Sequence, residues 1–271
     1  MPELPEVETT RRGIEPHVSG QIIAAVDVRQ PFLRWRVPPS LSRKLEGARV
    51  DCVGRRGKYL LLKTTSGTLI VHLGMSGSLR VVGDGVAPNA HDHVDVRLRN
   101  GLKLRLRDPR RFGAVLWTPS DPLRHPLLAA LGPEPLTDTF DGGWLYRCAR
   151  GRRAAVKTLI MNSRVVAGIG NIYASEALFL AGINPARSAR RISAHRFDGL
   201  AEAVKQVLEE ALEQGGTTLR DFVNGTGEPG YFAQFLRVYG RQGEPCIRCG
   251  APVRARVLGQ RSSYYCPRCQ R

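Results

Sequence analysis

The sequence predicts an α+β protein with an N-terminal antiparallel β domain, a C-terminal helical domain and a metal-binding β-hairpin at the end of the chain. Three observations support this prediction. Short alternating or apolar runs fill residues 21–119, a helical apolar period follows a proline- and glycine-rich stretch, and four of the six cysteines fall in the last 26 residues. A chain of 271 residues has room for one large or two modest domains.

Residues 6–18 have the spacing of an amphipathic helix, and seven later runs are predicted to be strands. The clearest pair is RLRNGLKLRLRD, in which alternating arms flank Asn100-Gly101, a dipeptide typical of hairpin turns. The intervals between the runs predict an antiparallel sandwich or barrel. The runs are QIIAAVDVRQ, ARVDCVGRRG, KYLLLKTT, TLIVHLGMSGSLRVVG, HVDVRLRN, GLKLRLRD and GAVLWTP.

The pattern changes at DPLRHPLLAALGPEPLTDTFDGG, whose prolines and glycines are typical of a linker. Beyond it, NIYASEALFLAGINP predicts a helix that starts at Asn171. A second helix is predicted in ISAHRFDGLAEAVKQVLEEALEQGG, which places its apolar residues on one face and ends at Gly215-Gly216. We therefore expect a domain over 1–132, a linker over 133–150, a helical domain over 151–236 and a terminal module over 237–271.

The net charge of +17 and the sequence pI near 10.4 exceed what solubility requires and predict a polyanionic partner, most often nucleic acid. Of the 41 basic residues only six are lysines. Arginine stays protonated and cannot act as a nucleophilic amine. Any amine chemistry in this protein must therefore use the N-terminus or one of those six lysines.

The terminal cysteines form two C-x2-C pairs, Cys246 with Cys249 and Cys266 with Cys269, with 16 residues between them. This spacing predicts a four-cysteine zinc site, with a metal-free loop or a redox pair as the alternatives. Four thiolates leave no open position for water or substrate, so we expect one structural Zn²⁺. The intervening VRARVLGQRSSYY predicts two strands with a tip at Gly259.

The terminal module is strongly basic. From Arg237 onward there are eight arginines and one acid, Glu244. This composition favours contact with a DNA duplex over a solvated basic tail.

Other features limit the class of protein. No apolar run approaches membrane-spanning length, and acids stand where a signal peptide would carry positive charge, so we expect a cytoplasmic protein without membrane contact.

Cys52 and Cys148 are isolated and are interpreted as buried apolar fillers. GTGEPG at 225–230 matches a dinucleotide-binding pattern only literally, because it neither follows a strand nor opens a helix.

The chain opens MPELPEVET. A small residue at position 2 normally allows removal of Met1, which would leave Pro2 as a free secondary amine next to Glu3. The alternative is a simple helix start, because proline suits the first helical turn and acids there complement the helix dipole.

Taken together, these motifs resemble the bacterial formamidopyrimidine-DNA glycosylase (Fpg) family over nearly the whole chain. The resemblance implies an N-terminal β-sandwich, a C-terminal domain with a helix–two-turns–helix motif and a zinc finger. It also implies a base-excision repair enzyme that excises oxidised purines, such as 8-oxoguanine and formamidopyrimidines, from duplex DNA and then cuts the strand. The motifs are PELPEVET at 2–9, GRRGKYLLL at 54–62, HLGMSGSLR at 72–80, HDHVD at 91–95, DPRRFGAVLW at 108–117, GIGNIYASEALF at 168–179 and PGYFAQFLRVYGRQGEPC at 229–246, followed by the cysteine finger.

The resemblance implies roles for the reacting residues. Pro2 matches the nucleophile that attacks C1′ of the damaged nucleotide and forms a Schiff base. Glu3 matches the acid that protonates the sugar or the departing base, and Glu6 is interpreted as its helper. Lys58 matches the lysine that contacts phosphate and assists β-elimination, and Arg261 the residue of phosphate binding and δ-elimination.

The resemblance also implies DNA-binding residues. Met75, Arg110 and Phe112 match the side chains that fill the gap left by the extruded base, with Arg110 contacting the opposite cytosine. For Met75 and Phe112 the alternative is ordinary core packing. We expect phosphate contacts from the following residues, with Lys157 near the lesion: His91, Arg152, Asn171 and Arg261.

Three further expectations concern the lesion pocket and the state of the protein. The loop around 217–230 is expected to close over the extruded base. Asn162 stands where the family commonly has an acid, which predicts a local electrostatic change. The protein is expected to act as a monomer on DNA that carries an oxidised purine opposite cytosine.

Two other functions stay open at this point. An endonuclease VIII-like glycosylase would prefer oxidised pyrimidines, although Leu4 and DPRRFG favour the purine branch. A non-catalytic zinc-ribbon DNA-binding protein would explain the charge and the cysteines but not Pro2-Glu3.

Overall fold

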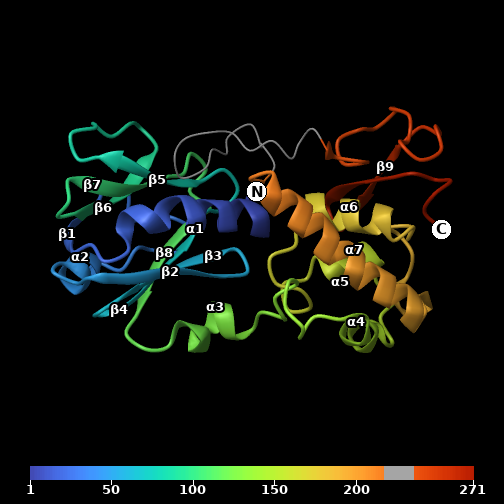
Figure 1. Ribbon diagram of the computed structural model, residues 1–271, viewed down its shortest axis with the longest axis horizontal. Helices are drawn as coiled ribbons and strands as arrows, with labels where there is room; N and C mark the ends of the chain where they lie inside the picture. The colour runs from blue at the N-terminus through green and yellow to red at the C-terminus, as the bar shows by residue number, and fades with distance from the viewer. Residues whose placement is uncertain (217–234) are drawn as a thin grey trace. The chain divides into compact units, whose positions relative to one another are not determined.

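The computed structural model describes residues 1–216 and 235–271. They form two compact units: unit 1 holds Met1–Ala130 and residues 214–216, and unit 2 holds Leu131–Glu213 and residues 235–271 (Figure 1). Within the described ranges, no helix has both the length and the apolar character needed to cross a bilayer.

Unit 1 is a β-sandwich of two antiparallel four-stranded sheets, which confirms the predicted fold class. One sheet has the order β1-β6-β7-β5 and the other β2-β3-β4-β8. The strands are β1 (Ile23–Val28), β2 (Val50–Arg56), β3 (Tyr59–Thr64), β4 (Gly67–His72), β5 (Ser78–Gly83), β6 (Asp92–Leu98), β7 (Leu102–Arg107) and β8 (Ala114–Thr118).

All seven predicted runs contain strands, and the run at 68–83 contains two, β4 and β5, which belong to different sheets. The β6–β7 hairpin turns at Asn100-Gly101 as expected: Gly101 has φ +79°, and the Asn100 side-chain oxygen accepts the Leu102 N–H at 3.1 Å. Three of the strand pairs contain a local register shift, between Ile23 and Ala25, between Val50 and Cys52, and between Asp92 and Val94.

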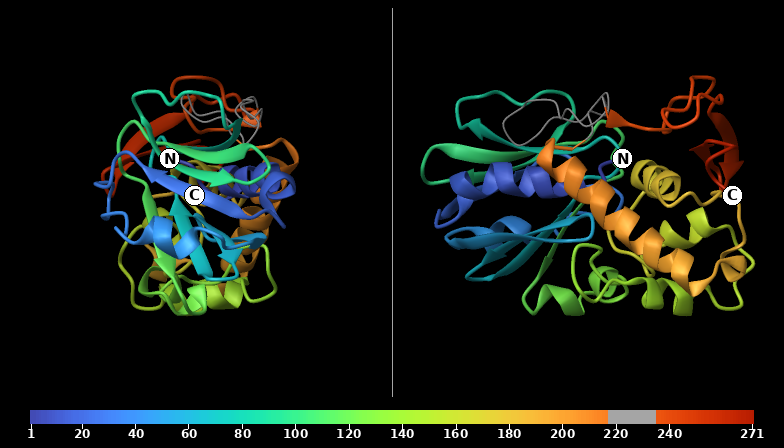
Figure 2. Two further views of the ribbon diagram at one scale, coloured as in Figure 1. Left: turned by 90° about the vertical axis from the view of Figure 1, so that its left-hand side faces the viewer. Right: turned by 45° about the vertical axis from the view of Figure 1, so that its right-hand side comes forward.

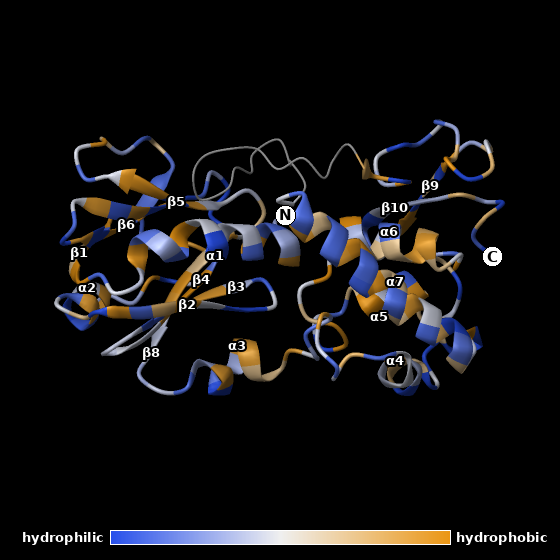
Figure 3. Cartoon of the chain, viewed as in Figure 1, coloured by the Kyte–Doolittle hydropathy of each residue, from blue (hydrophilic) through white to orange (hydrophobic). Residues whose placement is uncertain are grey.

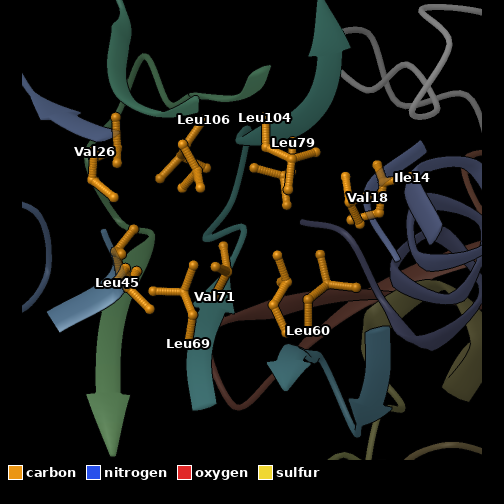
Figure 4. Close-up of a cluster of buried hydrophobic side chains, with 14 of the residues drawn as sticks. Ile14, Val18, Val26, Leu45, Leu60, Leu69, Val71, Leu79, Leu104 and Leu106 are labelled. Atoms are coloured by element: carbon orange, nitrogen blue, oxygen red, sulfur yellow. The ribbon is translucent and has the colours of Figure 1, made fainter. Parts of the chain in front are cut away.

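The core of unit 1 lies between the two sheets. Leucines and valines of β1, β5 and β7 point toward those of β3 and β4 (Figure 4), and Figure 3 shows hydrophobic residues along these strands. Helix α1 (Leu4–Val18) adds Ile14 and Val18 to this core and contacts β2, β3 and β5. Short helices complete the unit: α2 (Leu41–Leu45), η1 (Pro122–Arg124) and α3 (Pro126–Ala129).

Unit 2 is helical with a terminal β-hairpin. Its helices are α4 (Gly142–Ala149), α5 (Val156–Ile160), α6 (Asn171–Leu180), η2 (Ala189–Arg191) and α7 (Ala194–Glu213), and its strands are β9 (Arg254–Leu258) and β10 (Arg261–Tyr265). Helix α7, the longest in Figure 2, packs against both α4 and α6. The two helices predicted in this region are confirmed.

Helix α4 lies within the range 133–150 that composition assigned to a linker. Asp141 caps it by accepting the Trp144 N–H at 2.6 Å. A Cβ on Gly142 would lie 2.4 Å from the Asp198 backbone nitrogen. The glycine that suggested a linker therefore allows α4 and α7 to pack closely.

The interpretation of Cys52 and Cys148 as buried fillers is wrong. Cys52 is exposed and Cys148 is half-buried. The register between β2 and β3 shifts between Val50 and Cys52, so both Asp51 and Cys52 face solvent. Strict alternation along β2 does not reveal this bulge.

Candidate functional site

The N-terminal residues lie at the start of α1. Glu3 is its N-cap, and its backbone N–H donates to Oε2 of Glu6 at 2.7 Å while its own side chain accepts from the Glu6 N–H. This reciprocal capping box satisfies two backbone donors that a helix start leaves unpaired. Pro2, Glu3 and Glu6 are all buried, so the residue preceding the cap has a fixed position at the positive end of the helix dipole.

Lys58 lies in the β2–β3 turn, next to a histidine to which the sequence analysis assigned no role. Tyr59 pairs in register with His72 of β4, and their rings lie 4.8 Å apart. Burial, followed by the positive charges of Lys58 and Arg34, lowers the pKa of His72 to about 4. The ring is therefore neutral at physiological pH.

The tautomer of His72 follows from its hydrogen bond. Its Nδ1 lies 3.0 Å from the Gly74 backbone nitrogen and accepts its proton, which leaves the ring's own proton on Nε2. A neutral imidazole with one N–H next to Lys58 is suited to donate to an anionic oxygen. The signal that could have revealed it is its position in HLGMSGSLR, two residues before a left-handed glycine, Gly74.

The three gap-filling candidates come from two loops that touch. Met75 lies in the β4–β5 loop, and Arg110 and Phe112 lie in the β7–β8 loop. A Cβ on Gly74 would lie 2.5 Å from the Gly113 nitrogen, so these loops meet backbone to backbone. Phe112 is 45% exposed beneath the Arg110 guanidinium, 5.0 Å from its ring centroid, which is not core packing.

A buried carboxylate shapes the β7–β8 loop. Asp108 is fully buried, and its Oδ2 accepts the Gly113 N–H at 2.7 Å. Its carbonyl lies within hydrogen-bond distance of the Arg111 N–H and the His93 ring, and Arg111 has the uncommon φ of +56°. The loop therefore stores strain at the position where Arg110 and Phe112 project.

His91 lies at the end of a loop that hydrogen bonds from Arg105 hold against the sheet. Arg105 donates to the carbonyls of Val86 and Ala87 and to both oxygens of Asp95. Although burial raises the pKa of Asp95, hydrogen bonds from Arg105 and Arg29 lower it below the ordinary value. His91 itself is exposed, as a phosphate contact requires.

In unit 2 two predicted DNA-contacting residues hold the terminal hairpin. Lys157 is only 1% exposed, and its Nζ donates to Ser263 Oγ at 2.9 Å and to the Ser262 carbonyl at 3.2 Å. The Asn171 side chain, at the start of α6, donates to the same carbonyl at 3.0 Å. Both contacts fix the residue after Arg261, and the role of Lys157 near a lesion stays a prediction.

Arg261 follows a tight two-residue turn. Gly259 and Gln260 both have positive φ, 53° and 61°, and Leu258 pairs with Arg261. Two left-handed residues form the hairpin turn that matches strand twist. Arg261 is exposed beside this tip, where its side chain can reach a phosphate.

Glu176 is a second residue without a role in the sequence analysis. It is fully buried in α6 and accepts the backbone N–H groups of Arg237, Val238 and Tyr239 at 2.8–3.0 Å. Burial raises its pKa, against the effect of these hydrogen bonds. A lone acid within an otherwise apolar helix was the available signal, because such a group needs several donors.

The four cysteine sulfurs of the terminal module lie within 4.8 Å of one another. Cys246 and Cys269 Sγ are 3.9 Å apart, and Cys249 and Cys266 Sγ are 3.5 Å apart. These separations are far too long for a disulfide but suit sulfurs about 2.3 Å from one tetrahedral zinc ion. The predicted structural Zn²⁺ therefore fits, packed against Phe179 of α6.

The remaining residues that the sequence singled out lie outside the clusters described above. Asn162 is exposed just after α5, and its side-chain oxygen accepts the Arg164 N–H at 3.0 Å, so it caps a turn. The expected lesion-covering loop at 217–230 and the GTGEPG segment lie outside the described residues. Arg152 is exposed between α4 and α5.

Sequence comparison decides the family. Residues 1–115 match the formamidopyrimidine-DNA glycosylase N-terminal domain, 131–223 its H2TH domain, and 243–271 the zinc finger found in FPG and IleRS. The chain belongs to the formamidopyrimidine-DNA glycosylase family. The Fpg proteins of Methylococcus capsulatus and Syntrophotalea carbinolica are 62% and 60% identical over 271 residues, which is the whole of each chain.

Solved Fpg structures share the fold. The MutM (Fpg) protein of Thermus thermophilus is 41% identical with a TM-score of 0.89, covering 99% of this chain and 98% of that one. A Lactococcus lactis Fpg mutant in complex with DNA containing Fapy-dG is 32% identical with a TM-score of 0.93 over the whole of both chains. As a member of this family, the protein is a base-excision repair DNA glycosylase for oxidised purines with AP lyase activity.

The low pKa of His72 predicts a defined pH dependence of stability. The unfolded histidine titrates near 6.5 and the folded one near 4, so the unfolded state binds more protons between these values and stability falls as pH falls through them. Replacing His72 with Gln should remove about 2–3 kcal/mol of the acid-induced loss between pH 7 and pH 4. Urea unfolding of both proteins at several pH values measures it, and parallel losses would contradict the assignment.

The contact between the two loops predicts a severe effect of one methyl group. Gly74→Ala places a Cβ against Gly113 and Phe112, and we expect excision to fall by about 10²-fold because the candidate gap-filling side chains are displaced. Gly101→Ala is the matched control, since Gly101 is also left-handed but has open space around it. Single-turnover excision by the two variants tests this, and equal rates would refute the loop contact.

The zinc assignment predicts different behaviour for two cysteines. Cys266→Ser should lose the metal, unfold the terminal hairpin and weaken DNA binding, because metal binding and folding of such modules are coupled. Cys52→Ser, at an exposed position, should retain one zinc per chain. Metal analysis by mass spectrometry and a DNA-binding titration measure both outcomes, and full zinc content in Cys266→Ser would contradict the site.

Proposed function

We propose that this enzyme uses Pro2, freed by removal of Met1, as the nucleophile that excises oxidised purines. The observation that supports this best is the buried capping box of Glu3 and Glu6, which holds the nitrogen of Pro2 at the N-terminus of α1. A free α-amine has a pKa of about 7.7–8.0. At this ordinary value a fraction of the amine is uncharged near pH 7 and can act as a nucleophile.

The proposed reaction proceeds through a covalent intermediate. The Pro2 nitrogen attacks C1′, the bond from C1′ to the base breaks, and the base leaves with a proton; ring opening then gives an iminium. Loss of a proton from C2′ expels the 3′-phosphate, a second elimination expels the 5′-phosphate, and hydrolysis of the iminium frees Pro2. Glu3 supplies the proton to the sugar or the base, with Glu6 fixing its backbone.

The phosphate-binding roles follow from the available donors. Lys58 and the Nε2–H of His72 lie together in unit 1 and are proposed to bind the phosphate at the lesion and to assist β-elimination. Arg261 is proposed to bind phosphate and assist δ-elimination. His91, Arg152 and Asn171 contribute further phosphate contacts, with Lys157 near the lesion.

The lesion and its partner base define the proposed substrate. The protein acts as a monomer on chromosomal DNA in the cytoplasm, on duplexes that carry 8-oxoguanine or formamidopyrimidine opposite cytosine. Extrusion of the damaged nucleotide leaves a gap for Met75 and Phe112, and Arg110 hydrogen-bonds the unpaired cytosine. Exposed, mutually stacked Arg110 and Phe112 support this assignment.

Borohydride trapping tests the nucleophile. Reduction during reaction with an 8-oxoguanine duplex should give a covalent adduct whose peptide map places DNA on Pro2. A protein with one extra residue before Pro2 should give no adduct but retain salt-sensitive binding, because only the amine is blocked. An adduct on a lysine would reject Pro2, and faster excision of thymine glycol than of 8-oxoguanine would favour the endonuclease VIII-like alternative.

A further inference from the structure

Unit 2 carries an exposed cluster of arginines of which the proposed chemistry uses only one. Between residues 142 and 197 the chain has ten lysines and arginines but a single acid, the fully buried Glu176. Seven exposed arginines in and after α4 and around η2 are called the arginine surface: Arg147, Arg150, Arg152, Arg153, Arg187, Arg190 and Arg191.

The backbone brings two parts of this surface together. The segment after α4 runs antiparallel to the segment before η2, with an isolated bridge between Ala155 and Ser188. The Arg190 N–H donates to the Arg152 carbonyl at 3.1 Å, and the Val156 N–H donates to the Arg187 carbonyl at 2.8 Å. Arginines from two separate parts of the sequence therefore lie on one rigid strip.

The guanidinium groups of the arginine surface have no partner among the described residues: none of the ion pairs or side-chain hydrogen bonds in residues 1–216 and 235–271 involves them. Arg196, by contrast, donates to the carbonyls of Gly182 and Arg271 and is part of the fold. Burial and then the nearby charge of Arg187 lower the pKa of Arg196. The charge of Arg187 thus acts on Arg196, and none of the ion pairs of the described residues joins an acid to a guanidinium of the arginine surface.

Such an arrangement costs folding stability and is typical of a surface that binds a polyanion. The guanidinium group of arginine can donate two hydrogen bonds to the oxygens of one phosphate. Each DNA phosphate that a protein neutralises in this way releases bound counterions. We propose that the arginine surface binds backbone phosphates of duplex DNA beyond the damaged nucleotide, extending the single predicted contact of Arg152, and that it sets the affinity for undamaged DNA. This inference rests on the proposed function because it takes DNA as the partner.

The test compares two variants of equal charge. Arg187→Gln, Arg190→Gln and Arg191→Gln together remove three charges from the arginine surface. The control removes three exposed arginines from unit 1, Arg43→Gln, Arg99→Gln and Arg124→Gln. Each lowers the net charge from +17 to +14, and binding to an undamaged duplex is measured over a range of salt concentrations.

The logarithm of the DNA-binding constant falls linearly with the logarithm of the salt concentration, and the surface variant should make this slope less steep by about two to three, since each lost phosphate contact removes about 0.9. The control should change it by less than about one. Equal changes in both variants, or no change in the surface variant, would overturn the proposal. Thermal melting and zinc content show that each variant is folded.

A parallel measurement separates the two proposals. Wild-type excision of 8-oxoguanine reports on the proposed function alone, whereas the slope difference on undamaged DNA reports on the arginine surface alone. Binding of heparin that depends on the arginine surface, with duplex binding unaffected, would also overturn the proposal.

Discussion

The hydrogen bond from the Glu3 backbone to the Glu6 carboxylate fixes the start of α1 and therefore the position of the nitrogen that is proposed to react. A chain terminus is ordinarily among the most mobile parts of a protein. Here the first helix begins at Leu4, and both its cap, Glu3, and the residue before the cap, Pro2, are buried. The same helix packs through Ile14 and Val18 into the sandwich core, so the rigidity of the terminus derives from the rigidity of the whole unit.

Buried acids recur as anchors for loops that carry basic side chains outward. Asp108 holds the loop of Arg110, Asp95 holds Arg105 and through it the loop before His91, and Glu176 holds the segment that begins the zinc module. An acid engaged with backbone N–H groups or with a buried guanidinium leaves no negative charge at the surface. The fold therefore uses these acids to shape the loops that carry candidate DNA-binding residues, and it keeps their negative charge away from the exposed surface.

The sequence predicts what depends on local pattern. Alternating and apolar runs located the strands of unit 1, although one run holds both β4 and β5. Asn100-Gly101 located a turn and the cysteine spacing located the metal site, because each of these signals lies close in the sequence to the structure that it specifies. The contacts of Gly74, His72 and Glu176 could not be predicted in this way. Each depends on a partner distant in the sequence or on the course of a neighbouring loop, as does the close approach of Gly142 to α7.

The choice of arginine over lysine has a chemical consequence for an enzyme that forms an iminium. Any exposed primary amine near an abasic sugar can compete with the intended nucleophile, whereas a guanidinium binds phosphate but does not form an imine. Lys157 and Lys103 are buried, and the Lys44 amine lies 4.0 Å from the centroid of the Trp117 ring. The exposed arginines that are proposed to bind phosphate therefore add positive charge without adding primary amines, which keeps strong phosphate binding compatible with the amine chemistry proposed at Pro2.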